Sequence, residues 1–218
     1  MAAVEKSGKK ISLQTVERLS LYRKTLDDIH HEGIVHIYSH HLARMAGVTP
    51  AQLRRDLASF GSFGNISKGY HVYQLIVTIS RLLGTDTVQT VVLVGVGNLG
   101  RALLAYRGFE ERGFHIAVVF DSAPEKTNRV FAGRRCFPVE EIEKVLPDYR
   151  PTIAILACGP QGVQNVVESL GKAGVRVILN FVPKKITPPQ GMYVEDVDFS
   201  AKLEKLSFLS HFMMGDSS

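Results

Sequence analysis

Apolar residues in the first third of the chain recur at three- and four-residue steps, which is the spacing of a helix that buries one face. The first such stretch predicts a helix over residues 13–31, with Ser12 placed to cap its start. Its apolar positions are Leu13, Val16, Leu19, Leu26 and Ile29.

The following segments predict a helix-turn-helix with a wing. A short helix is expected over residues 40–45, and a basic helix begins with Thr49 as N-cap and Pro50 as the first helical residue. Glycine-bracketed apolar residues within 61–72 predict a small hairpin, and residues 73–83 predict a fourth helix. This order is typical of winged-helix domains that bind DNA.

After Gly84 the pattern changes, because short β-branched runs alternate with helical stretches. Such alternation predicts an α/β fold, a Rossmann-type parallel sheet with helices on both faces. The expected strands are 90–94, 116–120, 153–157 and 175–179, and the expected helices are 98–112, 161–173 and a final amphipathic one over 197–214. The predicted division is therefore a winged-helix domain (1–84), a Rossmann-type domain (85–196) and a C-terminal helix (197–218).

Composition and charge narrow the class of protein. Of the 218 residues, 45% are hydrophobic and 22% charged, as in a globular protein. No apolar run approaches the roughly 18 residues of a membrane span, and the start of the chain lacks a secretory signal, so we expect a cytoplasmic protein and no membrane partner. The formal net charge is +5, and residues 1–80 hold ten Lys and Arg against six Asp and Glu. The positive charge is therefore concentrated in the part expected to bind DNA.

The strongest chemical signal is a glycine turn between an apolar strand and a helix, formed by Gly95, Val96, Gly97, Asn98, Leu99 and Gly100. The first glycine allows a tight turn, the second lets the backbone approach a pyrophosphate, and the third lets the helix pack closely on the strand. Asp121 closes the next expected strand and is placed to bind the adenosine ribose. Because its carboxylate would repel a 2′-phosphate, we expect NAD(H) rather than NADP(H).

Further cofactor-binding candidates stand at the carboxyl ends of the expected strands, where ligands of such sheets bind. They are Ser122, Lys126, Ala157, Cys158, Gly159 and Asn180. Lys126 either steadies the adenosine phosphates or belongs to a solvated loop. The loops at 157–160 and 180–183 either line the nicotinamide half or are ordinary turns. Periodicity alone favours the core for the aromatic rings of Tyr106 and Phe199.

Residues 49–56 give the second chemical signal, because they open the helix that is expected to enter the major groove. Gln52 can read adenine, and Arg54 and Arg55 can read guanine or bind phosphates. The DNA-binding candidates are Ser39, Thr49, Gln52, Arg54, Arg55, Lys68 and Gly69. The alternative is a solvated helix that contacts another protein.

Metal binding and catalysis are not expected. The histidines between residues 30 and 41 lack a cysteine partner, and Cys136 and Cys158 are interpreted as small buried side chains. The chain leaves no room for a substrate domain, so the dinucleotide is interpreted as a sensed ligand. Two alternatives stay open: a small NAD-dependent oxidoreductase with a helical N-terminal domain, and a nucleotide-binding scaffold for a CoA-type ligand.

Taken together, these residues resemble the Rex family of redox-sensing transcriptional repressors over about residues 11–208. The matching segments are Arg18-Leu19, residues 52–57 (QLRRDL), 60–64 (FGSFG), Gly69-Tyr70, 93–103 (LVGVGNLGRAL), Tyr106, Phe109, 112–114 (RGF), Phe120-Asp121, 180–183 (NFVP) and 197–200 (VDFS).

The resemblance implies a homodimer whose C-terminal helix is swapped between subunits. It implies binding to palindromic operator DNA when NAD+ predominates and release when NADH binds. Phe199 would pack near the nicotinamide, and Arg18, Tyr106 and Asp198 would form a polar relay. The segment Cys158-Gly159-Pro160-Gln161 departs from the family's usual Val-Pro-Ala. The relative affinity of this chain for NADH and NAD+ is therefore not fixed by the resemblance.

Overall fold

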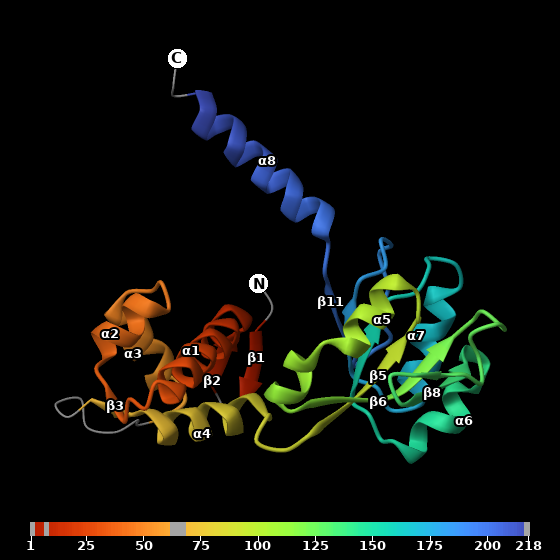
Figure 1. The fold of residues 1–218 in the computed structure, drawn as a ribbon, viewed down its shortest axis with the longest axis horizontal. Coiled ribbons are helices and arrows are strands. Elements are labelled where there is room, and N and C mark those ends of the chain that lie inside the picture. The colour runs from red at the N-terminus through yellow and green to blue at the C-terminus, as the bar shows by residue number, and fades with distance from the viewer. Residues whose placement is uncertain (1–2, 7–8, 62–68, 216–218) are drawn as a thin grey trace. The chain divides into compact units, whose positions relative to one another are not determined.

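The chain folds into two compact units, Met1–Thr87 and Val88–Ser218. Figure 1 shows the computed structural model, which describes residues 3–6, 9–61 and 69–215. Side chains are described for residues 11–61 and 69–213. Each unit has its own hydrophobic core, so each can be considered by itself.

Helices form most of the first unit. They are α1 (Leu13–His31), α2 (Ser39–Met45), α3 (Pro50–Ala58) and α4 (Val72–Leu83). Two short antiparallel pairs accompany them, β1 (Ala3–Lys6) with β2 (Lys9–Ser12), and β3 (His36–Ile37) with β4 (Tyr70–His71). The helices predicted at residues 13–31, at 40–45 and from Pro50 are confirmed.

Side-chain caps fix where these helices begin. The Ser12 hydroxyl accepts a hydrogen bond from the Thr15 N–H at 3.1 Å, and the Thr49 hydroxyl accepts one from the Gln52 N–H at 3.1 Å. A cap of this kind stabilises a helix by about 1 kcal/mol. Gly84 ends α4 in the left-handed region at φ 69°, which glycine adopts without steric cost.

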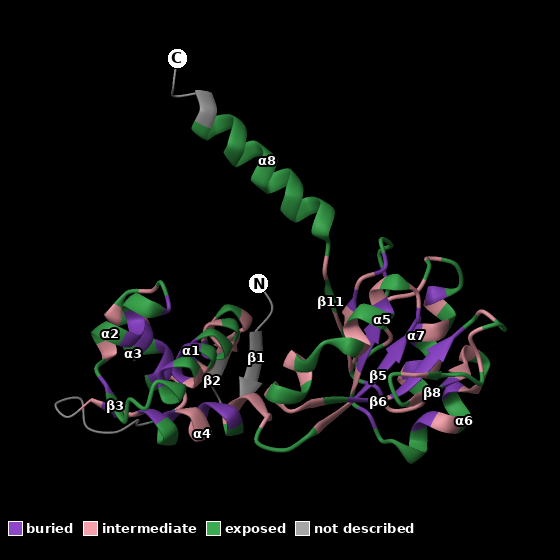
Figure 2. Cartoon of the chain, viewed as in Figure 1, coloured by how far each residue is buried: buried purple, intermediate pink, exposed green. Residues whose placement is uncertain are grey.

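The core of the first unit joins one face of each helix. Tyr22, Leu26 and Ile29 of α1 are fully buried, and Leu53 of α3 and Ile79 of α4 pack into the same cluster. Each fully buried apolar side chain contributes about 1.5–3 kcal/mol. Figure 2 shows buried segments, in purple, on α1, α3 and α4.

The predicted hairpin differs from the structure in its described part. Tyr70 pairs with Ile37, which precedes α2, and Val72 is the first residue of α4 rather than a strand residue. His71 caps α4 by accepting from the Gln74 N–H at 3.4 Å, which ends the strand there. Residues 62–68, and with them the candidate Lys68, lie outside the described residues.

The second unit contains a seven-stranded sheet in the order β11-β10-β9-β5-β6-β8-β7. Neighbouring strands are parallel except for the antiparallel pair β7 and β8. The strands are β5 (Gln89–Val94), β6 (Phe114–Asp121), β7 (Val130–Phe131), β8 (Arg134–Pro138), β9 (Ile153–Leu156), β10 (Val177–Asn180) and β11 (Tyr193–Asp196). The predicted Rossmann-type sheet is confirmed.

Helices cover both faces of this sheet. They are α5 (Asn98–Ala105), α6 (Ile142–Val145) and α7 (Val163–Lys172), with 3-10 segments η1 (Arg107–Arg112), η2 (Val139–Glu141) and η3 (Leu146–Asp148). Val92 and Val94 pack into the cluster that contains residues of α6 and α7, whereas Val91 and Leu93 pack into the cluster with Leu103 of α5. Strand β5 is apolar at successive positions because both of its faces are buried.

One local prediction for this unit was wrong, and one hairpin was not predicted. The helix predicted over 98–112 ends at Ala105, because Tyr106 is extended (ψ 104°), and η1 follows it. The hairpin of β7 and β8 was missed because its turn uses Ala132 and Gly133, both at positive φ. Alanine seldom adopts that conformation, so the sequence carries no usual turn signal there.

The last helix, α8 (Phe199–Gly215), is exposed along its described length. Asp198 caps it, its carboxylate accepting from the Ala201 N–H at 3.1 Å. Every described side chain from residue 201 to residue 213 is exposed, as Figure 2 shows. Within the described residues, no helix is both long and apolar enough to span a membrane.

Candidate dinucleotide-binding and DNA-binding sites

The candidate ligand site lies at the carboxyl edge of the parallel sheet. Strands β10, β9, β5 and β6 are neighbours and run in the same direction, so the turns that follow them meet at one edge. The chain leaves β5 toward β6 on one side, and β9 lies on its other side. Ligands of open α/β sheets bind in the crevice created by such a reversal.

Each glycine of the turn after β5 has a distinct structural role. Gly95 has φ +100°, and a Cβ there would lie 2.5 Å from the Ala157 carbonyl oxygen. A Cβ on Gly100 would lie 1.9 Å from the Gly95 carbonyl oxygen, so α5 packs on the strand at a distance that only glycine permits. A Cβ on Gly97 would meet no atom within 4 Å, so its backbone borders open space. These three environments match the roles predicted for the glycines.

Side chains from neighbouring elements hold the middle of this turn. The Val96 N–H donates to Asp121 Oδ2 at 2.8 Å, and Arg101 Nε donates to the Val96 carbonyl at 3.1 Å. Asp121 Oδ1 also accepts from the Ala123 N–H at 2.9 Å. The carboxylate of Asp121 therefore helps to build the turn, in addition to standing where a ribose is expected.

Asp121 is buried, yet its carboxyl group remains ionised. Burial alone would raise the pKa of Asp121, but the hydrogen bonds from Val96, Ala123 and Lys126 outweigh it and hold the pKa below its ordinary value. Lys126 Nζ lies 3.3 Å from Asp121 Oδ2. Lys126 is thus a partly exposed loop residue that forms an ion pair with the candidate ribose ligand.

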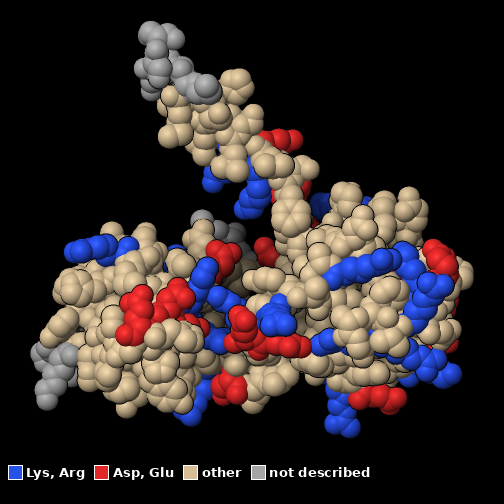
Figure 3. All heavy atoms as spheres, viewed as in Figure 1, with Lys and Arg blue, Asp and Glu red and all other residues tan. Residues whose placement is uncertain are grey.

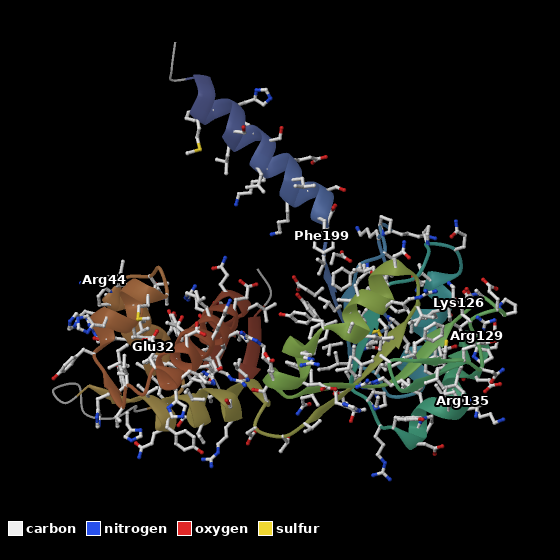
Figure 4. All side chains as sticks on the ribbon, viewed as in Figure 1. Glu32, Arg44, Lys126, Arg129, Arg135 and Phe199 are labelled. Atoms are coloured by element: carbon white, nitrogen blue, oxygen red, sulfur yellow. The ribbon has the colours of Figure 1, made fainter. Side chains whose placement is uncertain are left out.

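Two further basic side chains lie on the same side of the second unit as Lys126. Figure 4 labels Lys126, Arg129 and Arg135 there, and Figure 3 shows Lys and Arg on this part of the surface. Arg135 donates to Asn128 at 2.9 Å and stacks on the Phe137 ring at 4.9 Å. Of the three, Lys126 alone has an ion pair with Asp121.

Two cavities of the second unit contain the predicted ligand residues. One, of about 450 Å³, is lined by Val94, Ser122, Val139, Glu140, Cys158, Gly159, Gln161, Gly162, Asn165, Val166 and Ser169. The other, of about 530 Å³, is lined by Asn180, Phe181, Val182, Pro183, Lys184, Lys185, Asp196, Val197, Asp198, Phe199 and Ser200. The loops after β9 and β10 therefore line different cavities; from the sequence, either the nicotinamide half or ordinary turns had been open for both loops.

The second cavity has an aromatic wall and a fixed amide. The rings of Phe181 and Phe199 lie 5.8 Å apart. Asn180 is buried, and its side-chain nitrogen donates to Asp196 at 2.7 Å while its oxygen accepts from the Val182 N–H at 3.0 Å. These contacts hold the loop after β10 in one conformation.

Two aromatic residues do not belong to the core, contrary to their periodicity. Tyr106 is 59% exposed and Phe199 is 58% exposed. Tyr106 lies beside Phe109 with its ring edge-on at 5.1 Å, and Phe199, labelled in Figure 4, begins α8 at the second cavity. Both rings are therefore accessible to a ligand or to a second protein chain.

The cysteines behave as unreactive thiols. Cys136 is buried, as predicted, and burial raises the pKa of its thiol to about 11. Cys158 is partly exposed, and burial raises its pKa as well. Both therefore stay protonated near neutral pH. Among the described residues, no group of three or more His, Cys, Asp and Glu side chains is placed to hold a metal ion.

In the first unit, α3 presents the predicted DNA-binding side chains. Arg54 and Arg55 are exposed, and Arg54 Nη1 donates to the Ser39 hydroxyl of α2 at 3.2 Å. Gly69 has φ +78° beside Ile37. The candidates Ser39 and Arg54 thus connect α2 to α3, and Arg55 is exposed on α3.

The buried carboxylate of Asp56, a residue of α3, was not predicted from the sequence. Asp56 is 2% exposed and accepts from Arg18 Nε at 2.6 Å and Nη2 at 2.8 Å. It also accepts from the Tyr22 hydroxyl at 2.8 Å and from Gln52 Nε2 at 2.7 Å. A signal was present, since Gln52 and Asp56 are four residues apart on a helix and so share a face.

These hydrogen bonds decide the charge of Asp56. Burial alone would raise its pKa, but the hydrogen bonds from Arg18, Tyr22 and Gln52 outweigh burial and lower it. The pKa of Tyr22 is raised, first by burial and then by its hydrogen bond to Asp56. Asp56 is therefore an ionised acceptor for three side chains. Arg18 belongs to the first unit, whereas Tyr106 and Asp198 belong to the second, so their relay stays a prediction.

A glycine turn at the carboxyl edge of a Rossmann-type sheet, with a separate helix-turn-helix unit, defines the class of nucleotide-binding DNA-binding regulators. Residues 86–184 match the domain family described as CoA binding domain, and residues 10–58 match the family described as putative DNA-binding protein N-terminus. The chain belongs to the Rex family of redox-sensing transcriptional repressors.

Curated relatives cover nearly all of the chain. The redox-sensing transcriptional repressor Rex of Carboxydothermus hydrogenoformans is 40% identical over 201 residues, which are 92% of this chain and 97% of that protein. Rex of Streptomyces coelicolor is 39% identical over 194 residues, 89% of this chain and 75% of that protein. These relatives are named as transcriptional repressors, which supports a regulator and not an oxidoreductase.

Solved relatives share the same fold. The crystal structure of RSP in complex with β-NAD+ and operator DNA has a TM-score of 0.87 at 28% identity, covering 95% of this chain and 99% of that one. RSP in complex with β-NADH has a TM-score of 0.83, covering 94% and 96%. A second structure describes RSP as a Rex-family repressor. The predicted family and fold class are confirmed.

Proposed function

We propose that this chain binds palindromic operator DNA as a homodimer and releases it when NADH binds, so that transcription follows the NADH/NAD+ ratio. The observation that carries the proposal is the similarity of the whole chain to RSP, which has been crystallised both with NAD+ and operator DNA and with NADH. The proposed functional parts are residues 1–84 for DNA, 85–196 for the dinucleotide and 197–218 for dimerisation. The proposed location is the cytoplasm.

The proposed dinucleotide site follows the carboxyl edge of the sheet. The pyrophosphate lies on the open backbone of Gly97 at the start of α5, where free N–H groups and the helix dipole attract an anion. The adenosine lies toward Asp121, Ser122 and the cavity of Cys158 and Gly159. The nicotinamide enters the second cavity, beside Asn180 and Phe199. The proposed cofactor-binding residues are Gly95, Val96, Gly97, Asn98, Leu99, Gly100, Asp121, Ser122, Lys126, Ala157, Cys158, Gly159, Asn180 and Phe199.

The proposed DNA contacts begin at the start of α3. Arg54 and Arg55, in the middle of α3, are exposed and carry no ion pair among the described residues. The proposed contact residues are Ser39, Thr49, Gln52, Arg54, Arg55, Lys68 and Gly69. Two copies of α3 in a two-fold dimer would meet half-sites about one helical turn apart, roughly 34–36 Å.

The redox response follows from the charge of the ring. Oxidised nicotinamide carries a positive charge that the reduced ring lacks, so the reduced ring enters a site with an aromatic wall at lower desolvation cost. If the closed form of the site does not fit operator spacing, NADH shifts the population away from DNA. The free energy of this population shift equals the difference between the binding free energies of NADH to the closed form and to the DNA-binding form. Arg18, Tyr106 and Asp198 are the proposed relay between the parts.

The test of this function begins with selection of bound DNA from a random pool. The selected operator is then titrated with NADH and with NAD+ while its affinity is measured by fluorescence anisotropy. We expect a palindrome, and release by NADH at concentrations at which NAD+ leaves the complex intact. Equal effects of the two nucleotides would contradict the proposal, and so would turnover of NADH with small carbonyl compounds.

The exposed apolar side chains of α8 give a first prediction. Leu206 and Leu209 belong to a set that is exposed in the single chain, which also contains Leu203, Phe208, Phe212 and Met213. An apolar patch of this kind usually marks an interface. Replacing Leu206 and Leu209 together by lysine is expected to convert the dimer to a monomer in sedimentation velocity at micromolar concentration. Ser207→Lys, on the polar side of the same helix, should remain dimeric.

The ion pair of Lys126 with Asp121 gives a second prediction. Lys126 reduces the negative charge that a 2′-phosphate would meet, since its Nζ lies 3.3 Å from the Asp121 carboxylate. Lys126→Gln should therefore weaken binding of NADPH several-fold more than binding of NADH, as measured by calorimetry at low salt. Lys144→Gln, an exposed change of equal charge on α6, should leave the ratio unchanged. Equal weakening of both nucleotides by Lys126→Gln would assign Lys126 to the shared phosphates instead.

A further inference from the structure

Gln52 is held at both its backbone and its side chain. Its N–H donates to the hydroxyl of the cap residue Thr49 at 3.1 Å, and its Nε2 donates to Asp56 Oδ1 at 2.7 Å. It lies in the first turn of α3 and is partly exposed. A glutamine at this position of an unrestrained helix would sample several rotamers, whereas this one is fixed from two sides.

The chemistry of Asp56 decides which way the amide of Gln52 faces. An ionised carboxylate accepts hydrogen bonds and donates none, so the NH2 group of Gln52 must be the part that faces it. Arg18 keeps Asp56 ionised by donating to both of its oxygens, at 2.6 and 2.8 Å. Gln52 Oε1 consequently points away from Asp56, and within the described part of the chain it receives no hydrogen bond.

We propose that Asp56 is a positioning residue for operator recognition, fixing Gln52 so that it reads adenine. The proposal rests on the proposed operator binding. Gln52 presents a free carbonyl oxygen and its second amide hydrogen, which complement the N6 amino group and the N7 of adenine in the major groove. Guanine and thymine offer acceptors where the carbonyl oxygen of Gln52 needs a donor. Cytosine offers an amino group but no neighbouring acceptor, so it would be the second choice.

The orientation distinguishes this site from an unrestrained glutamine. A freely rotating amide can turn its NH2 group outward and donate to guanine O6 or thymine O4. The buried carboxylate prevents that rotation. Asparagine at position 56 would present both a donor and an acceptor to Gln52, so the amide could then adopt either orientation.

The experiment measures base preference at each operator position by selection from a random pool, followed by affinities for single-base variants of the selected site. The wild type should require adenine at one symmetric position, where guanine or thymine lowers affinity on the order of tenfold. Gln52→Met should reduce that ratio to about one. Asp56→Asn should reduce it as well, with affinity for random DNA unchanged and NADH binding intact as the sign of a folded protein. Gln14→Met on α1, the same change at an exposed site, should keep the wild-type ratio.

A second variant serves if Asp56→Asn does not fold. Glu in place of Gln52 cannot donate to Asp56 and is repelled by it. Its carboxylate accepts from the amino group of cytosine but cannot donate to the N7 of adenine, so Gln52→Glu should replace the requirement for adenine by a preference for cytosine. An unchanged requirement for adenine in Gln52→Glu would overturn the proposal, as would an unchanged ratio in folded Asp56→Asn. A wild type that selects no palindrome would instead contradict the proposed function, which keeps the two failures separate.

Discussion

Gly100→Ala is expected to abolish dinucleotide binding and to destabilise the second unit. A Cβ at this position would lie 1.9 Å from the Gly95 carbonyl oxygen and 2.9 Å from its carbon, so α5 must move away from β5. Such overpacking costs about 1–3 kcal/mol. Movement of α5 also displaces the N–H groups that are proposed to bind the pyrophosphate. NADH affinity should therefore fall at least about a hundredfold, or about 2.7 kcal/mol, in a calorimetric titration.

Gly97→Ala is the matched comparison for this prediction. A Cβ on Gly97 meets no atom within 4 Å, and the residue has an ordinary φ of −70°. The substitution should therefore leave the thermal unfolding temperature nearly unchanged while it hinders the approach of the pyrophosphate. Wild-type NADH affinity in Gly100→Ala would show that the close packing of α5 is not needed. Equal losses of stability in the two variants would show that Gly100 is not more tightly packed than Gly97.

Asp56→Ala is expected to have the largest effect on the stability of the first unit. It leaves the Tyr22 hydroxyl, the Gln52 amide and the Arg18 guanidinium without their shared acceptor. Removing one partner of a buried ion pair costs about 3–5 kcal/mol. The Arg18 side chain is 26% exposed and partly regains water, so we expect about 3 kcal/mol. Urea unfolding monitored by circular dichroism would measure it.

The pH dependence of stability tests the same carboxylate. Because the pKa of Asp56 is lower in the folded protein than in the unfolded chain, its contribution is fully present above the unfolded value of about 3.9. It is lost as the pH falls through the folded value. Asp56→Ala should therefore show a smaller loss of stability below about pH 4 than the wild type does. Parallel curves for the two proteins would contradict the assigned ionisation.

Local sequence signals were sufficient for the helix starts and for the glycine turn. Ser12 and Thr49 cap their helices through hydrogen bonds that span three residues. The close packing of Gly100 on the Gly95 carbonyl likewise lies within one strand-turn-helix segment. In each case the interacting groups are near neighbours in sequence, so residue type and spacing contain the information.

Signals failed where residue type was atypical for its conformation. The β7–β8 hairpin was not predicted because its turn contains Ala132 at positive φ. The helix predicted to continue to Arg112 ends before Tyr106, which is extended. Periodicity also assigned Tyr106 and Phe199 to the core, although both are exposed. A period describes which side of a helix a residue occupies, but it does not say whether anything covers that side.

By itself, the sequence determined the two-part organisation, the Rossmann-type turn and the family resemblance, because these depend on short segments whose residues interact within one element or with the next. The tertiary structure alone decided what holds the functional side chains. Lys126 forms an ion pair with Asp121 because of the conformation of one loop. Asp56 accepts hydrogen bonds from Arg18 and Tyr22, which lie on a helix more than thirty positions earlier. The partners of Asp56 are brought together by packing of separate elements, and no spacing along the chain records that packing. The Lys126 ion pair depends instead on the path of the loop after β6, which residue types alone do not specify.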